Sequence, residues 1–179
     1  AISFPYPTGE WADAGNYFEQ ADKHSTTIIS SEAQKAVIMH QLDTANYYTA
    51  CNWQGQADIF EKQRHRFVVA PKASNSFSMT VTFSGSQSIP NISFQQCLQS
   101  SQSGWIKFWQ SGGAVDFSGS TDERAMEIER RVVLSQYLTK LQCAGNFPPQ
   151  ETGLTYNSWF GKPHLEMHWW HGVHFALWG

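Results

Sequence analysis

The residues best suited to chemistry gather in one stretch of the chain, residues 153–179, which reads GLTYNSWFGKPHLEMHWWHGVHFALWG. This stretch holds four of the eight tryptophans and four of the seven histidines, with Glu166 as its single carboxylate. On a helix, residues three and four apart are neighbours, so one face carries His164, His168 and His171. At about 100° per residue the other face carries Glu166, Trp169, Trp170 and Val173.

These residue types in this pattern favour carbohydrate recognition. A pyranose ring presents a flat C–H face, on which a tryptophan stacks, and a rim of hydroxyls, which carboxylates and imidazoles bind. A glutamate held among aromatic side chains is also a device by which glycosidases tune a carboxyl group. The predicted substrate-binding residues are Glu166, His164, His168, Trp159, Trp169 and Trp170.

Two other interpretations of the same stretch stay open. The tryptophans and histidines could be packing residues of a buried helix. Alternatively, His164 and His168 have the i, i+4 spacing of a zinc-binding helix, but the sequence is H-L-E-M-H and not H-E-x-x-H, and Glu166 lies off the histidine face. We therefore expect no metal and no cofactor.

Short strands are predicted before residue 92. Phe77, Met79, Val81 and Phe83 alternate with Ser and Thr, the period of a half-buried strand, and are expected to face the core. Further strands are predicted over residues 35–42, 47–51, 57–60 and 66–70. Their spacing of roughly ten residues predicts an antiparallel β-sandwich. Residues 1–34 are predicted to be rich in loops. Trp11 and Trp53 are expected in loops, with packing favoured over a role as sugar platforms.

Helices are predicted in the second half of the chain, over residues 93–110, 121–144 and 164–178. Ser120 and Glu123 have the spacing of a capping box, and Gly145 with the following prolines ends the second helix. A short strand is predicted over residues 114–117. The fold class is therefore α+β.

Composition excludes several functions. The 179 residues carry a net charge of −3 and no lysine- or arginine-rich stripe, so we expect no nucleic-acid partner. No apolar run approaches the ~20 residues that cross a bilayer, so we expect no membrane partner. Cys51, Cys97 and Cys143 lack zinc-site spacing and are expected to be buried thiols.

The tail resembles the (α/α)6-barrel glycoside hydrolases and phosphorylases of the trehalase and maltose-phosphorylase type, the six-hairpin glycosidases. In that family a Gly-Leu-Thr turn leads through a short aromatic loop into a Trp-Asp-Thr-Glu segment. Here Gly153-Leu154-Thr155 leads through Gly161 to Leu165-Glu166-Met167-His168 at the same spacing, and Phe147-Pro148-Pro149 resembles the family's Ile-Pro-Ala. The whole tail also resembles a branch of these enzymes with a segment of the type N-S-W-F/Y-G-K-x-H-L-E-M-H-W-W-H.

The resemblance implies an internal piece of a larger enzyme that hydrolyses glycosidic bonds of oligo- or polysaccharides. Residues 1–92 would be the late part of a β-sandwich domain, residues 93–120 a linker with a helix and a short strand, and residues 121–179 the first helices of an incomplete (α/α)6 barrel. The general acid is then expected outside this chain, which alone would be inactive. By analogy the enzyme would be secreted or periplasmic, although no signal peptide is visible.

The departures from the family limit what carries over. Leu165 and Glu166 replace the Trp-Asp pair that holds a sugar, so the identity of the sugar and the choice between hydrolase and phosphorylase stay open. The alternative function is a non-catalytic carbohydrate-binding or structural β-sandwich fragment. Besides a carbohydrate, the expected partner is the remainder of its own polypeptide, or a second copy joined through the aromatic C-terminal helix.

Overall fold

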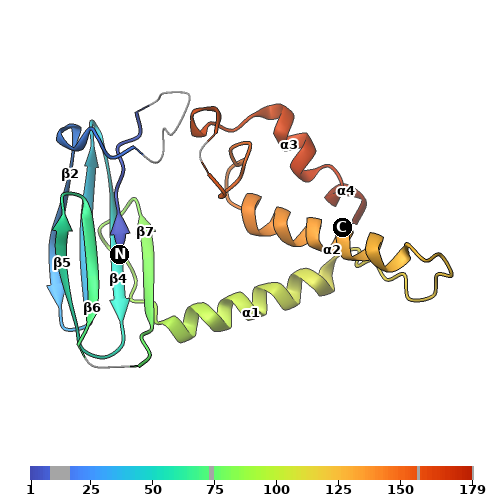
Figure 1. Cartoon of the computed structure of the whole chain (residues 1–179), viewed down its shortest axis with the longest axis horizontal. Coiled ribbons are helices and arrows are strands. Elements are labelled where there is room, and N and C mark those ends of the chain that lie inside the picture. Colours follow the sequence, from blue (N-terminus) through green and yellow to red (C-terminus); the bar gives the residue numbers. More distant parts are fainter. Residues whose placement is uncertain (9–16, 73–74, 157, 179) are drawn as a thin grey trace. The chain divides into compact units, whose positions relative to one another are not determined.

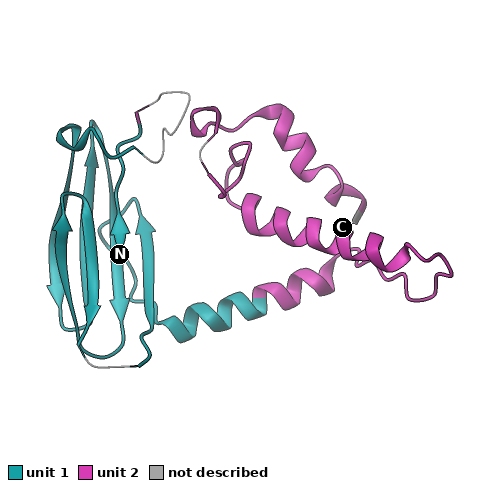
Figure 2. Cartoon of the chain, in the orientation of Figure 1, with its two compact units in different colours: residues 1–7, 16–103 teal, residues 8–15, 104–179 magenta. Residues whose placement is uncertain are grey.

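The computed structural model describes residues 1–8, 17–72, 75–156 and 158–178. The chain divides into two compact units (Figure 2). The β unit comprises residues 1–7 and 16–103, and the helical unit comprises residues 8–15 and 104–179. The division falls inside a helix, and the domain boundaries expected after residues 92 and 120 stay predictions.

The β unit contains two antiparallel sheets (Figure 1), which confirms the predicted α+β class with antiparallel strands. The four-stranded sheet has the order β2 (His24–Glu32), β3 (Lys35–Leu42), β4 (Ala45–Trp53) and β7 (Met79–Ser84). The three-stranded sheet has the order β1 (Ile2–Ser3), β6 (Arg66–Pro71) and β5 (Ala57–Gln63). A short 3-10 helix, η1 (Ala21–Lys23), leads into β2.

Side chains of both sheets form one hydrophobic core. Its buried members come from the segment after β1 and from strands β3, β4 and β6: Phe4, Ala36, Ile38, Cys51, Trp53 and Phe67. A second, smaller core of Val37, Ala50 and Ile89 lies on the opposite face of the four-stranded sheet, because neighbouring residues of a strand point to opposite faces. The segment around Ile89 thus covers part of the outer face.

The predicted facing of residues 77–83 is confirmed, because Phe77 and Met79 pack against the core and Val81 lies opposite Cys51 in the register, but the burial is incomplete. Val81 and Phe83 are 36% and 62% exposed, whereas Thr80 is buried. Strand β7 is the edge of the four-stranded sheet, and the opposing sheet has only three strands, so the inner face of this edge stays partly uncovered. On the outer face, the Thr80 hydroxyl donates to the carbonyl of Ile92 at 2.8 Å.

The prediction that residues 1–34 are mainly loops is wrong for β1 and β2. Strand β2 has few strong apolar residues, and its pairing with β3 rather than its own composition holds it extended. Trp53 ends β4 and is 5% exposed, so it lies in the core rather than in a loop. Trp11 and the rest of residues 9–16 lie outside the described residues.

Helix α1 (Phe94–Ser111) begins at a capping box that was not predicted: the Ser93 hydroxyl accepts from the Gln96 amide, and the Gln96 side chain accepts from the Ser93 amide. Helix α2 (Ala125–Cys143) starts later than predicted. The predicted capping box at Ser120 and Glu123 is wrong, because the Ser120 hydroxyl accepts from Asp122 instead. The predicted strand over residues 114–117 is also wrong, since this segment has no strand partner and the Phe117 amide donates to the Glu129 carboxylate.

The C-terminal segment forms a 3-10 turn η2 (Trp159–Gly161), helix α3 (Leu165–Gly172) and helix α4 (Phe175–Trp178). The single helix predicted over residues 164–178 is therefore wrong. The Val173 amide still bonds four residues back to Trp169, but the Ala176 amide bonds only three residues back to Val173, which tightens the turn and breaks the helix. None of the helices in the described ranges is long and apolar enough to span a membrane.

The cysteines differ in their environments. Cys51 is buried, Cys143 is half-buried and Cys97 is exposed, so the expectation of three buried thiols is wrong for Cys97. Cys97 lies on helix α1, none of whose described residues is buried.

Candidate functional site

The Gly-Leu-Thr turn is fixed onto the end of α2. Gly153 has a φ of +59° and is buried, and a Cβ atom at this position would lie 2.7 Å from the backbone oxygen of Gln142. Only glycine combines this left-handed backbone with so close an approach. The Leu154 amide donates to the Gln142 side-chain oxygen at 3.0 Å, which ties the turn to the helix a second time.

The loop that follows is held by the Gln150 carboxamide and by hydroxyl bonds. Gln150 Nε2 donates to the carbonyls of Gly153 (2.7 Å) and Tyr156 (3.2 Å), and Gln150 Oε1 accepts from the Ser158 amide (3.3 Å). The Thr152 and Ser158 hydroxyls lie 3.0 Å apart and share a further bond. This network fixes the entry to the aromatic turn at residues 159–161.

The aromatic turn has an unusual backbone. Trp159, Phe160 and Gly161 have φ values of +47°, +61° and +67°. Bulky residues rarely adopt the left-handed region, and such outliers cluster at ligand-binding and active sites. The turn presents Trp159, which is 43% exposed, and its indole meets the His164 imidazole edge to face with 5.2 Å between ring centroids.

Helix α3 begins immediately after this pair. His164 is its extended N-cap residue, and its carbonyl accepts from the His168 amide at 3.1 Å. Glu166 lies in the first turn and is exposed, where the positive end of the helix dipole favours a carboxylate. Trp159, His164 and Glu166 thus come from one short segment that runs from the turn into the helix.

The predicted division of α3 into two faces holds only in part, because His164 is the extended residue before the helix and contacts Trp159, and Val173 is half-buried. Trp169 and Trp170 are 64% and 63% exposed, like Glu166. His168, which is also exposed, and His171 line a cavity of about 310 Å³ in the helical unit, together with Phe108 of α1, residues from the end of α2, Pro149 and Phe175. The structure therefore separates His168 from Glu166, although the sequence placed both in one candidate site.

This cavity is mainly apolar and contains one cation. The Lys140 ammonium lies 4.8 Å from the centroid of the Phe108 ring and 5.5 Å from that of Trp105, so two aromatic faces hold its charge. Burial raises the pKa of the Cys143 thiol, which keeps it protonated and unreactive. The Nδ1 atom of His171 is buried without a hydrogen-bond partner in the described ranges.

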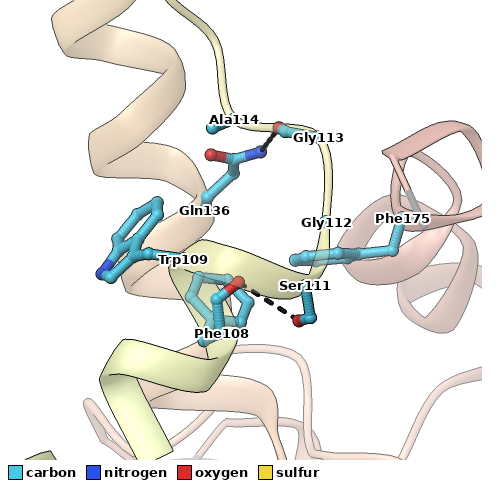
Figure 3. Close-up of a pocket in the computed structure, with 8 residues that line it drawn as sticks. All are labelled: Phe108, Trp109, Ser111, Gly112, Gly113, Ala114, Gln136 and Phe175. Carbon is cyan, nitrogen blue, oxygen red and sulfur yellow. Dashed lines mark hydrogen bonds between the residues drawn. The ribbon is translucent and has the colours of Figure 1, made fainter.

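A much smaller pocket, about 40 Å³, joins α1, α2 and α4 (Figure 3). Gln136 is 4% exposed and its Nε2 atom donates to the carbonyl of Gly113 at 3.2 Å, while the Phe175 ring closes the other side. Pockets for small-molecule ligands usually measure about 300–1,000 Å³. We interpret the contacts around this pocket as packing that fixes the loop after α1 to helix α2.

Among the described residues, the structure provides no set of side chains that could bind a metal ion. Within residues 1–8, 17–72, 75–156 and 158–178, no group of three or more His, Cys, Asp or Glu side chains lies close enough together to hold a metal ion. His164 contacts an indole and His168 lines the apolar cavity, so the histidines on one face of α3 do not converge on a common point.

A cluster that the sequence did not reveal lies in the β unit. His24, His40 and His65 are each less than 9% exposed. His24 Nδ1 lies 2.7 Å from His40 Nε2, and the His24 and His65 rings stack with 3.8 Å between centroids. Burial, and then the nearby histidines, lowers the pKa of His40 to about 4. No sequence spacing signals this cluster, because the pairing of β2 with β3 brings residues 24 and 40 together, and His65 joins them from the turn between β5 and β6, where it bonds to Thr26 and Ala21.

Comparisons of the chain with known protein families, with curated proteins and with solved structures found no match to any of them.

Proposed function

We propose that this chain is part of a carbohydrate-active enzyme of the six-hairpin glycosidase type, which hydrolyses glycosidic bonds of oligo- or polysaccharides. In this proposal the sheets belong to a β-sandwich domain, and helices α2 and α3 are the first helices of an (α/α)6 barrel. The segment from Trp159 to Glu166 forms part of a sugar-binding subsite.

One observation supports the proposal most strongly. A half-exposed tryptophan is held in a left-handed turn and in ring contact with His164, the residue that precedes the helix whose first turn carries the exposed carboxylate of Glu166. A large aromatic face left open to solvent in a strained backbone is what a stacking platform for a sugar ring requires. A tryptophan that served only the core would instead be covered by the chain.

The roles of the three residues follow from their chemistry. The Trp159 indole stacks on the C–H face of the ring and excludes water from it. The Glu166 carboxylate accepts hydrogen bonds from ring hydroxyls, which are stronger than neutral ones because the acceptor is charged. The His164 imidazole, oriented by its contact with Trp159, binds a further hydroxyl. Exposed Trp169 and Trp170 extend the apolar surface along α3.

None of these residues is proposed as the proton donor. A glycosidase requires a general acid and a second carboxylate, which either activates a water on the other face of the sugar or attacks the sugar itself. The family resemblance implies a general acid far downstream in the barrel, outside this chain, and Glu166 is assigned to binding. The chain itself therefore binds sugar without cleaving it.

The experiment is a titration of the chain with neutral oligosaccharides, followed by tryptophan fluorescence and calorimetry. The Trp159→Ala variant is compared with Tyr156→Ala, which removes another exposed aromatic ring from the same loop. Stacking of a sugar on Trp159 predicts that the first variant loses at least tenfold in affinity and the second does not. Equal affinities of both variants and the wild type would contradict the proposal.

A further inference from the structure

A polar cavity of about 180 Å³ lies in the β unit, where the end of β4 meets the start of α1. Asn52 faces away from the core between the sheets, because the neighbouring Cys51 and Trp53 belong to that core. Around Asn52 the cavity is lined by the uncharged polar residues Gln34, Gln54, Ser78, Asn91 and Ser93.

Trp53 also lines the cavity, and its Nε1 atom is buried without a hydrogen-bond partner in the described ranges. Asn52 is the other lining residue of this kind. It is only 7% exposed, and neither its Oδ1 nor its Nδ2 atom has a hydrogen-bond partner in the described ranges. A buried carboxamide normally has its donors and its acceptor bonded, because leaving them unpaired costs free energy. Two neighbouring hydroxyls are engaged elsewhere: that of Thr80, opposite Asn52 in the register, donates to Ile92, and that of Ser93 caps α1.

The chemistry of the cavity restricts its ligand. Its polar side chains are amides and hydroxyls, which offer neighbouring donors and acceptors without a net charge. This matches adjacent hydroxyl groups and provides no counter-charge for a phosphate or a carboxylate. Phe94, at the start of α1, adds a 44% exposed aromatic ring that suits the C–H face of a sugar.

The size of the cavity restricts the ligand further. Pockets for drug-sized molecules usually measure about 300–1,000 Å³, so about 180 Å³ accommodates a smaller molecule. We propose that this cavity is a binding subsite for a single neutral sugar residue, whose hydroxyls satisfy the buried carboxamide of Asn52. The subsite uses none of the residues proposed for binding at the aromatic turn and does not depend on that proposal.

The test is a titration of the ¹⁵N-labelled full chain with glucose, galactose and mannose, followed by the side-chain amide signals of Asn52 and Asn91. Glucuronate and galacturonate are the charged probes. At least one neutral hexose is expected to shift both signals saturably with a Kd below about 10 mM. The corresponding uronate is expected to bind at least tenfold more weakly.

The matched variants are Asn52→Leu and Asn46→Leu. Both residues lie on the same face of β4, but Asn46 is exposed. Asn52→Leu is expected to weaken hexose binding at least tenfold, measured by the Asn91 signal, and Asn46→Leu to leave it unchanged. If Asn52→Leu disturbs the β unit, Asn91→Ala at the exposed rim is expected to weaken binding several-fold instead, measured by the Asn52 signal.

Three results would overturn the inference: no hexose shifts the Asn52 signals at about 50 mM, hexose and uronate bind equally, or the cavity variants bind as the wild type does. The first result would mean that the cavity holds water only. Binding at the aromatic turn is reported separately by the Trp159 indole signal. The Trp159→Ala variant is expected to leave the Asn52 shifts intact, so the two proposals can fail independently.

Discussion

The Nδ1 atom of His24 and the Nε2 atom of His40 lie 2.7 Å apart at one end of the core between the two sheets. At this distance one nitrogen donates a proton and the other accepts it, so the two rings cannot both be fully protonated in this arrangement. The Nδ1 atom of His40 lies 2.8 Å from the Tyr47 hydroxyl, whose pKa is raised by burial. The geometry of this pair therefore favours neutral imidazoles over imidazolium ions.

The first prediction is a loss of stability of the β unit in acid. Burial, followed by the charges of His65 and Arg64, lowers the pKa of His24, and the pKa of His40 falls to about 4. Because both values lie below the unfolded value of 6.5, the unfolded chain binds more protons, and stability falls as the pH drops from about 6.5 to about 4. His40 alone accounts for at most roughly 3 kcal/mol of this loss.

Urea unfolding of the β unit at pH 7.5, 6.0 and 4.5, followed by amide signals of β3, measures this effect. Other charges near the pair belong to Arg64 and to Asp22, with which Arg64 forms an ion pair. The His40→Gln variant is expected to flatten the pH dependence, and the exposed-residue control His168→Gln to keep it. Stability that is independent of pH between 6.5 and 4.5 would contradict the neutral pair.

The second prediction concerns Gly153. An alanine there has an unfavourable backbone conformation, which costs about 1–2 kcal/mol, and its Cβ atom meets the Gln142 backbone at 2.7 Å. We expect Gly153→Ala to release the turn from α2, with at least tenfold faster hydrogen exchange at the Leu154 amide. The control is Gly119→Ala, where a Cβ atom meets nothing within 4 Å. Equal exchange in the two variants would show that the turn does not depend on this contact.

The third prediction concerns self-association. Leu165 and Leu177 are 91% and 86% exposed; Leu165 lies on α3 with exposed Trp169 and Trp170, and Leu177 lies on α4. Exposed apolar clusters of this kind usually mark a contact with another protein surface. We expect the chain to self-associate at tens of micromolar in light scattering, and the double variant Leu165→Lys, Leu177→Lys to shift it toward the monomer. The control is Leu154→Lys, a 78% exposed leucine in the preceding loop. A monomeric wild-type chain would contradict this expectation.

The elements that sequence could predict are those whose own residues carry a clear period. Strand β3 was predicted with its observed bounds, and helices α1 and α2 were predicted to within a few residues. Strand β2 was not predicted, because its extended conformation depends on its pairing with β3 and not on its own residues. The facing of β7 was predicted correctly, but its burial was not, because the burial of a sheet edge depends on how far the opposing sheet reaches, which no local pattern encodes.

The same distinction applies to the candidate site. The helical period at α3 correctly separated the exposed tryptophans from His171, which lines the cavity. The contact between Trp159 and His164 depends on three consecutive left-handed residues, and the sequence offers only Gly161 as a signal for them. The Asn52 cavity was missed because its polar residues come from four separate segments of the chain.

The most direct test of the proposed sugar site is the affinity of the Glu166→Gln variant for an oligosaccharide that binds the wild-type chain. Glutamine keeps the shape of the side chain but removes the charge that strengthens its bonds to hydroxyls. Such bonds contribute about 1.5–3 kcal/mol, so we predict a 10- to 150-fold higher Kd, with Glu123→Gln, which changes another exposed carboxylate, as the control. An unchanged Kd in Glu166→Gln would contradict the assignment of the start of α3 to sugar binding.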